Sequence, residues 1–150
     1  MPAPKELVAA VEDLCAKTGE KFEVTEKVVD GTEMHVVYVR NHPLPSRYSS
    51  ASATFGFRVP FRFPDACPED TFFIFPHEIK LVEEDPIRKS KDIHRAGKAD
   101  NVLKGTELAD VPVLIFSWHL WNKVPWDRNK HTLVDHYQHC LRRFEQPEHD

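Results

Sequence analysis

Prolines are concentrated in the middle of the chain, and they limit what this part can form. Seven of the twelve prolines lie between Pro43 and Pro86. Each proline lacks a backbone N–H donor and biases the residue before it towards extended geometry, which disfavours long helices. The stretch from Pro60 to Pro68 contains three prolines and cannot be regular. The sequence therefore predicts a middle section of strands and stiff turns.

Helical periodicity is confined to the two ends of the chain. Residues Lys5 to Lys17 carry apolar side chains at three-and-four spacing, which predicts an amphipathic helix that ends at Thr18-Gly19. A second helix begins near Thr132, where Asp135 three places later completes a pattern typical of a capping box. Its apolar stripe consists of Leu133, Tyr137, Cys140, Leu141 and Phe144.

Four β-rich runs lie between these helices. The runs Phe22–Val29 and Met34–Arg40 flank Asp30-Gly31, a dipeptide that suits a tight hairpin turn. The run Ser52–Val59 alternates apolar and polar side chains, as a half-buried strand does. Thr71–Phe75 predicts a fourth strand, which resumes at Ile79 to Val82 after Pro76-His77. Together these runs predict a four-stranded antiparallel meander.

The composition changes after the fourth predicted strand. Residues Glu83 to Asp110 include 13 charged side chains among 28 and predict a long variable loop. An apolar, aromatic segment from Val111 to Trp121 then leads towards the final helix. The predicted fold class is α+β, with one domain spanning residues 1–150.

Composition and charge exclude several classes of function. The chain has 20 basic and 24 acidic side chains, so it lacks the basic field that nucleic-acid binding requires. Its longest strongly apolar stretch is far shorter than the roughly 20 residues of a membrane-spanning helix, and its start lacks a signal peptide's apolar region. We therefore expect no nucleic-acid partner, no membrane contact and a cytoplasmic location.

The cysteines and histidines do not form a recognisable cofactor or metal motif. Cys15, Cys67 and Cys140 are too few and too widely spaced for a disulfide framework, so we expect reduced thiols. His136 and Cys140 have helical spacing, but the cysteine belongs to the apolar stripe while His136 and His139 fall at its polar edge. Phosphate loops and nucleophile elbows are also missing, so we expect neither a metal nor a cofactor.

Two local signatures stand out in the sequence. One is Phe63-Pro64-x-x-Cys67-Pro68, followed by the strand that starts near Phe72. The other is the segment with Phe116, Ser117 and His119, followed by Trp126-Asp127 and the last helix. The first is similar to the Tyr-Pro-x-x-Pro-Pro turn of the ubiquitin-conjugating-enzyme (UBC) superfamily, and the second to the Ser-Arg-His-Trp signature of its bacterial branch, prokaryotic family E. The resemblance covers roughly residues 20–145 and implies a UBC-like fold.

The resemblance implies a relay in which a cysteine carries a ubiquitin-like modifier as a thioester. A thiol is required, because an alcohol would give an ester too stable to pass on quickly. In the superfamily this thiol follows the fourth strand, but residues 68–139 of this chain contain no cysteine. We therefore expect a binding or scaffold subunit without thioester activity.

Two catalytic alternatives remain open. Cys67 lies beside the proline turn and is the candidate for an atypical carrier, although the neighbouring Asp65, Glu69 and Asp70 should raise its pKa. His119 lies in the most aromatic stretch and is the candidate for a general base or for orienting a carbonyl group.

The resemblance also implies partners. These are a ubiquitin-like protein, an activating enzyme and a metalloprotease-type deconjugase. The first helix, the variable loop and the proline turn are the candidate contact surfaces, with Phe63, Pro64 and Pro68 as partner-binding residues. An interaction module of the RWD type, which has a similar plan but no link to modifiers, is the alternative from another functional class.

Overall fold

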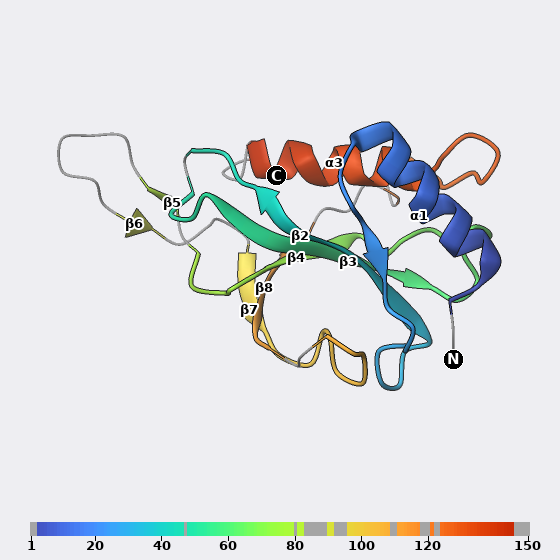
Figure 1. The fold of residues 1–150 in the computed structure, drawn as a ribbon, viewed down its shortest axis with the longest axis horizontal. Helices are drawn as coiled ribbons and strands as arrows, with labels where there is room; N and C mark the ends of the chain where they lie inside the picture. The colour runs from blue at the N-terminus through green and yellow to red at the C-terminus, as the bar shows by residue number, and fades with distance from the viewer. Residues whose placement is uncertain are drawn as a thin grey trace.

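The computed structural model describes residues 3–46, 48–79, 81–82, 90–91, 96–108, 111–117, 121 and 124–145. Over these residues the chain is an α+β protein, as predicted, with a six-stranded antiparallel sheet and two helices (Figure 1). The helices are α1 (Lys5–Thr18) and α3 (Leu133–Glu145).

The sheet has six strands rather than the predicted four. Its order is β1-β2-β3-β4-β8-β7, so the predicted meander forms its first two thirds. Two strands that follow the meander in the sequence extend it, because β8 pairs with β4 and β7 pairs with β8. The strands are β1 (Glu23–Val24), β2 (Met34–Pro43), β3 (Ser52–Pro60), β4 (Thr71–Phe75), β7 (Ala96–Ala99) and β8 (Val113–Ser117).

The first and fourth predicted strands are shorter than their β-rich runs. Within the run Phe22–Val29, only Glu23–Val24 form a strand, β1. Val29 also forms an isolated β-bridge with Met34, and these two residues flank the turn in which Gly31 has a φ of 75°. The run Ile79–Val82 does not continue β4. Its last two residues form β5 (Leu81–Val82), which pairs with β6 (Ser90–Lys91) in a separate two-stranded sheet.

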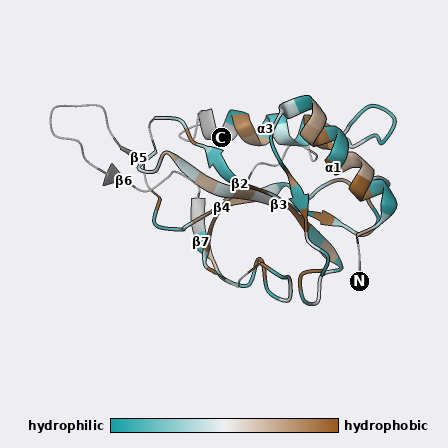
Figure 2. Ribbon diagram, viewed as in Figure 1, coloured by the Kyte–Doolittle hydropathy of each residue, from teal (hydrophilic) through white to brown (hydrophobic). Residues whose placement is uncertain are grey.

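Helix α1 confirms the prediction almost residue by residue. It buries Leu7, Val11 and Leu14, whereas Val8, another apolar position at helical spacing, is 38 % exposed. It ends at Gly19, which adopts the left-handed conformation (φ 75°) and donates its N–H to the Cys15 carbonyl oxygen. The alternation of hydrophobic and hydrophilic residues along α1 can be followed in Figure 2.

Helix α3 confirms the predicted capping box and most of the predicted stripe. The Asp135 carboxylate accepts the N–H of Thr132 at 2.7 Å, and the Thr132 hydroxyl accepts the N–H of Val134 at 3.2 Å. Leu133, Tyr137 and Cys140 are buried. The prediction for His136 was wrong, because this side chain is buried at 3 % exposure rather than placed on a polar edge.

Both helices cover the same face of the sheet (Figure 1). The larger hydrophobic core lies between this face and the helices, and the alternation of β3 directs Phe55, Phe57 and Val59 into it. Aromatic side chains from neighbouring strands meet there, and the rings of Phe72 and Phe116 stack with centroids 4.8 Å apart.

The opposite face of the sheet is covered by part of the predicted variable loop. Val102, Leu103 and Leu108 pack there against Val36 and Phe73 in a second hydrophobic core. This corrects the prediction of a loop over residues 83–110, because the described part contains β7 and a buried, packed segment. The segment 100–108 therefore acts as a third layer of the fold.

Backbone and carboxylate contacts hold this layer in place. The Asp30 N–H donates to the Lys104 carbonyl oxygen at 2.8 Å. The Glu107 carboxylate accepts the N–H groups of Glu26 at 2.6 Å and of Lys27 at 3.2 Å. Partial burial raises the pKa of Glu107, but these backbone donors outweigh it and the net shift is downward.

Candidate functional site

The three thiols are placed differently, and two have a raised pKa. Burial, followed by the charge of Asp70, raises the pKa of Cys67, which is partly buried within the proline turn. Burial also raises the pKa of Cys140 well above its ordinary value, because this thiol lies in the larger core. Cys15 donates its thiol proton to the Phe22 carbonyl oxygen at 3.3 Å. The pKa of Cys67 thus moves in the predicted direction, with burial as the main cause.

His119 lies outside the described residues, as do Trp118 and Leu120. Its assignment as a general base or carbonyl-orienting group stays a prediction.

The proline turn is anchored by a tryptophan from the segment before α3. Phe63 is 5 % exposed and its ring packs against Trp126, with centroids 5.9 Å apart. The Trp126 indole N–H donates to the Pro64 carbonyl oxygen at 2.7 Å. An ion pair between Arg128 and Asp65 adds a second link. The two sequence signatures that carry the UBC resemblance therefore contact each other in space.

The burial of this turn decides which of its atoms a partner could reach. Phe63 and Pro68 are buried in the chain and Pro64 is half-buried, so their assignment as partner-binding residues stays a prediction. The large apolar side chain exposed next to this turn is Phe61, at 44 %. Val124, at 46 %, is similarly exposed two residues before Trp126. Val124 and Trp126 also line a hollow of about 690 Å³ together with Asp65 and Arg128.

Histidines and tryptophans form a cluster under the start of α3. The Trp121 indole N–H donates to Nδ1 of His136 at 3.1 Å, and the His131 ring lies 4.9 Å from Trp121, between centroids. His139 stands at the edge of the same indole, 6.2 Å away. Within the described ranges, no group of three His, Cys, Asp or Glu side chains has the geometry to hold a metal ion.

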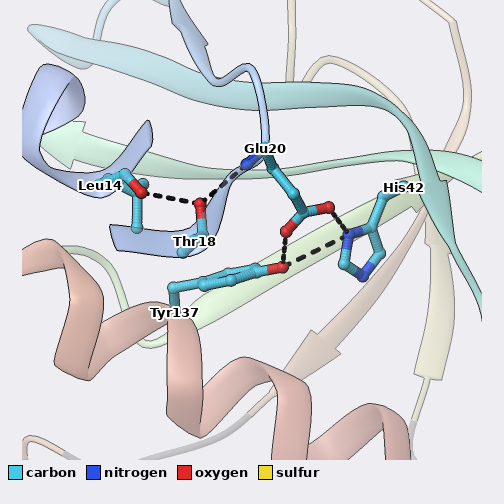
Figure 3. A network of polar contacts seen from close by, with 5 residues as sticks. All are labelled: Leu14, Thr18, Glu20, His42 and Tyr137. Atoms are coloured by element: carbon cyan, nitrogen blue, oxygen red, sulfur yellow. Dashed lines mark hydrogen bonds and ion pairs between the residues drawn. The ribbon is translucent and has the colours of Figure 1, made fainter. Parts of the chain in front are cut away.

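A second polar site was missed from the sequence. Figure 3 shows Glu20, His42 and Tyr137 converging from the loop after α1, from β2 and from α3. Nδ1 of His42 lies 2.9 Å from Oε1 of Glu20, and because a carboxylate only accepts, this nitrogen is the donor. The Tyr137 hydroxyl donates to Oε2 of Glu20 and lies 3.4 Å from Nδ1 of His42. Burial, followed by the bond to Glu20, raises the pKa of Tyr137.

Local backbone geometry places each end of this network. The Thr18 hydroxyl donates to the Leu14 carbonyl oxygen and accepts the N–H of Glu20, which fixes the carboxylate beyond the end of α1 (Figure 3). A register shift in β2 between Val39 and His42 includes Asn41 at φ 55°, and it directs the His42 ring inward, 4 % exposed. The tripeptide Asn41-His42-Pro43 directly follows the predicted run Met34–Arg40, and it is the sequence feature from which such an irregularity at the end of β2 could have been predicted.

The network borders a cavity of about 650 Å³ between the end of β2 and α3. Its walls are mainly apolar, and its polar groups include Glu20 and His42. Pockets that hold small molecules combine an apolar lining with a few convergent polar groups in this way. The apolar part of the lining consists of Val39, Pro43, Leu44, Pro45, Leu141 and the Tyr137 ring.

The chain matches no protein-family model, no curated protein and no solved structure. In the part of the chain that the structure describes, no helix has both the length and the apolar character needed to cross a membrane.

Proposed function

We propose that the chain is a UBC-like protein that binds partners in a bacterial ubiquitin-like modification pathway without carrying a thioester. The observation that carries this proposal is the state of its thiols. The pKa of Cys67 and that of Cys140 are both raised, and a thioester carrier needs a thiolate that forms readily near neutral pH. The order of helix, antiparallel strands and final helix supports the UBC-like assignment.

The proposed binding surface is the end of the molecule where the proline turn meets the segment before α3. Trp126 packs against Phe63 and donates its indole N–H to the Pro64 carbonyl oxygen, so the proline turn and the segment before α3 are held together in the unbound chain. Phe61 and Val124 are among the few large apolar side chains exposed in the described residues. Exposed apolar side chains on a rigid frame are suited to a protein partner. A ubiquitin-like protein or its activating enzyme is the proposed partner, in the cytoplasm.

Incubation with activating enzyme, ATP and modifier tests the absence of thioester activity. We expect no thiol-labile conjugate of the chain on a non-reducing gel. A conjugate that disappears in Cys67→Ser would instead support the alternative in which Cys67 is an atypical carrier.

Calorimetric titration of the chain with the modifier and with the activating enzyme tests the binding role. We expect saturable binding to one of the two, weakened at least tenfold by Phe61→Asp or Val124→Asp. The matched control is Lys98→Asp on β7, an exposed position at the far edge of the sheet. Binding to neither protein would favour a module of the RWD type and overturn the proposal.

A further inference from the structure

The cavity between the end of β2 and α3 contains a carboxylate, Glu20, that no lysine or arginine among the described residues neutralises. Among the described residues, the ion-pair partner of Glu20 is His42, which is charged only when protonated. The other Glu20 oxygen accepts from the neutral Tyr137 hydroxyl. The Glu20 side chain is 23 % exposed, so much of its surface has lost contact with water. Such a charge interacts more strongly with a cation than one in bulk water does.

The cationic residues that line the cavity do not neutralise this carboxylate. The guanidinium of Arg40 lies 3.6 Å from Glu23 and 5.5 Å above the centre of the Tyr38 ring, so its charge is already partnered elsewhere. Lys21 is exposed and forms no ion pair with Glu20 in the described structure. A ligand that carries its own positive charge would therefore complement the cavity.

We propose that this cavity binds an alkylammonium group, with the ammonium head paired to Glu20 and the aliphatic stem against Val39, Leu44 and Leu141. The tyrosine ring of Tyr137 adds an aromatic wall beside the head group. The cavity volume of about 650 Å³ lies within the range of small-molecule sites. The residues that line this cavity do not include Phe61 or Val124, which form the proposed protein-binding surface, so the proposal does not depend on the proposed function.

Three six-carbon probes with different head groups test the proposal on the unaltered full-length chain. They are n-hexylammonium, 1-hexanol and hexanoate, titrated into ¹⁵N-labelled protein at about pH 8, where an ordinary imidazole is neutral. We expect n-hexylammonium to shift the backbone amides of Glu20, Asn41 and Leu141 with a Kd at least tenfold lower than that of hexanol. Equal binding of hexanol, tighter binding of hexanoate, or shifts elsewhere in the chain would overturn the proposal.

Variants then assign the head-group preference to one carboxylate. Glu20→Gln keeps a side chain that can accept from Tyr137, and it should abolish the preference for the ammonium probe over hexanol. Glu12→Gln, at an exposed position of α1, is the matched control and should retain the preference. Retention of the preference in Glu20→Gln would overturn the assignment. Because the three-probe comparison uses the natural sequence, it decides the proposal even if a variant folds poorly.

The same ammonium chemistry occurs in lysine side chains and in small free amines. Nα-acetyl-lysine N-methylamide and its norleucine counterpart, which lacks the ammonium group, separate these sources. Binding of the lysine compound as tight as that of n-hexylammonium, without binding of the norleucine compound, would assign the site to a partner's lysine. Binding of n-hexylammonium alone would assign it to a free amine.

Discussion

The indole N–H of Trp121 donates to Nδ1 of His136 at 3.1 Å, and this bond fixes the protonation of a buried imidazole. Because Nδ1 is the acceptor, the proton of the neutral ring resides on Nε2. That atom is buried and has no hydrogen-bond partner among the residues that the structure describes, and the ring meets Phe57 edge-to-face with centroids 4.7 Å apart. Burial, assisted by the charge of His139, lowers the pKa of His136 to about 3.

The lowered pKa of His136 predicts acid sensitivity of the fold. Below pH 6.5, the ordinary pKa of histidine, His136 is protonated in the unfolded chain but stays neutral in the folded protein. The free energy of unfolding therefore falls as the pH decreases towards about 3. The loss should approach about 1.4 kcal/mol per pH unit. Urea unfolding from about pH 7.5 to 4.5 measures it.

His136→Gln keeps an acceptor for the indole but cannot titrate, so its stability should depend less on pH over this interval. His77→Gln, at a partly exposed site, serves as the control and should retain the slope of the natural sequence. An identical slope in His136→Gln and the natural sequence would assign the acid sensitivity to another group.

Glu107 predicts a second, local pH effect on the layer that covers the far face of the sheet. The pKa of Glu107 in the folded protein is below its ordinary value of 4.5. The hydrogen bonds from the Glu26 and Lys27 N–H groups to its carboxylate therefore stabilise the fold above pH 4.5, and this stabilisation is lost as the pH falls through the folded pKa. Glu107→Ala should therefore accelerate hydrogen exchange of the Glu26 and Lys27 amides at neutral pH. NMR exchange rates measure this, and unchanged rates in the variant would contradict it. Glu78→Ala, at an exposed position after β4, is the control.

The spacing of apolar residues along the sequence predicted those helices and strands that bury only one face. Helix α1 and strands β2 to β4 have clear patterns, and the structure places them within a few residues of the predicted bounds. β8 was not recognised, because Val113 is buried in one core and Phe116 in the other. A strand buried on both faces is a continuous apolar run, which periodicity cannot distinguish from other buried segments. β7 was missed because Ala-Gly-Lys-Ala contains no β-branched or aromatic residue.

The network of Glu20, His42 and Tyr137 could not be predicted from sequence patterns, for a different reason. Glu20 and His42 lie 22 positions apart, and His42 and Tyr137 lie 95 apart. Local spacing rules describe neighbours on one helix or strand, so they cannot identify a network built across three elements. The docking of Trp126 on Pro64, 62 positions apart, was likewise found only in the structure.

Gly56 predicts a packing limit in the centre of the sheet. A Cβ atom at this position of β3 would lie 2.7 Å from Cζ of Phe73 and 2.8 Å from the Val37 carbonyl oxygen. One of these contacts is with backbone, which cannot move aside as a flexible side chain can. Gly56→Ala should therefore destabilise the protein by about 1–3 kcal/mol. Chemical denaturation measures this, and Thr54→Ala in the same strand, which adds no atoms, should cost less. A Gly56→Ala variant as stable as the natural sequence would contradict the close packing.

The raised pKa of Cys67 predicts a sluggish thiol. Burial and the nearby charge of Asp70 both disfavour the thiolate, so little of it forms at neutral pH. Alkylation by iodoacetamide, followed by peptide mass spectrometry, should be several-fold slower at Cys67 than at free glutathione. The pH at which the alkylation rate reaches half its maximum should lie above the ordinary thiol value of about 8.5.

Asp70→Asn should lower the alkylation midpoint, because it removes the charge while keeping an acceptor for the backbone N–H of Trp121. A midpoint below about 8.5 in the natural sequence would instead identify an activated thiol. That result would favour the reading in which the chain itself carries the modifier, since activation of Cys67 is the property that a scaffold subunit does not need.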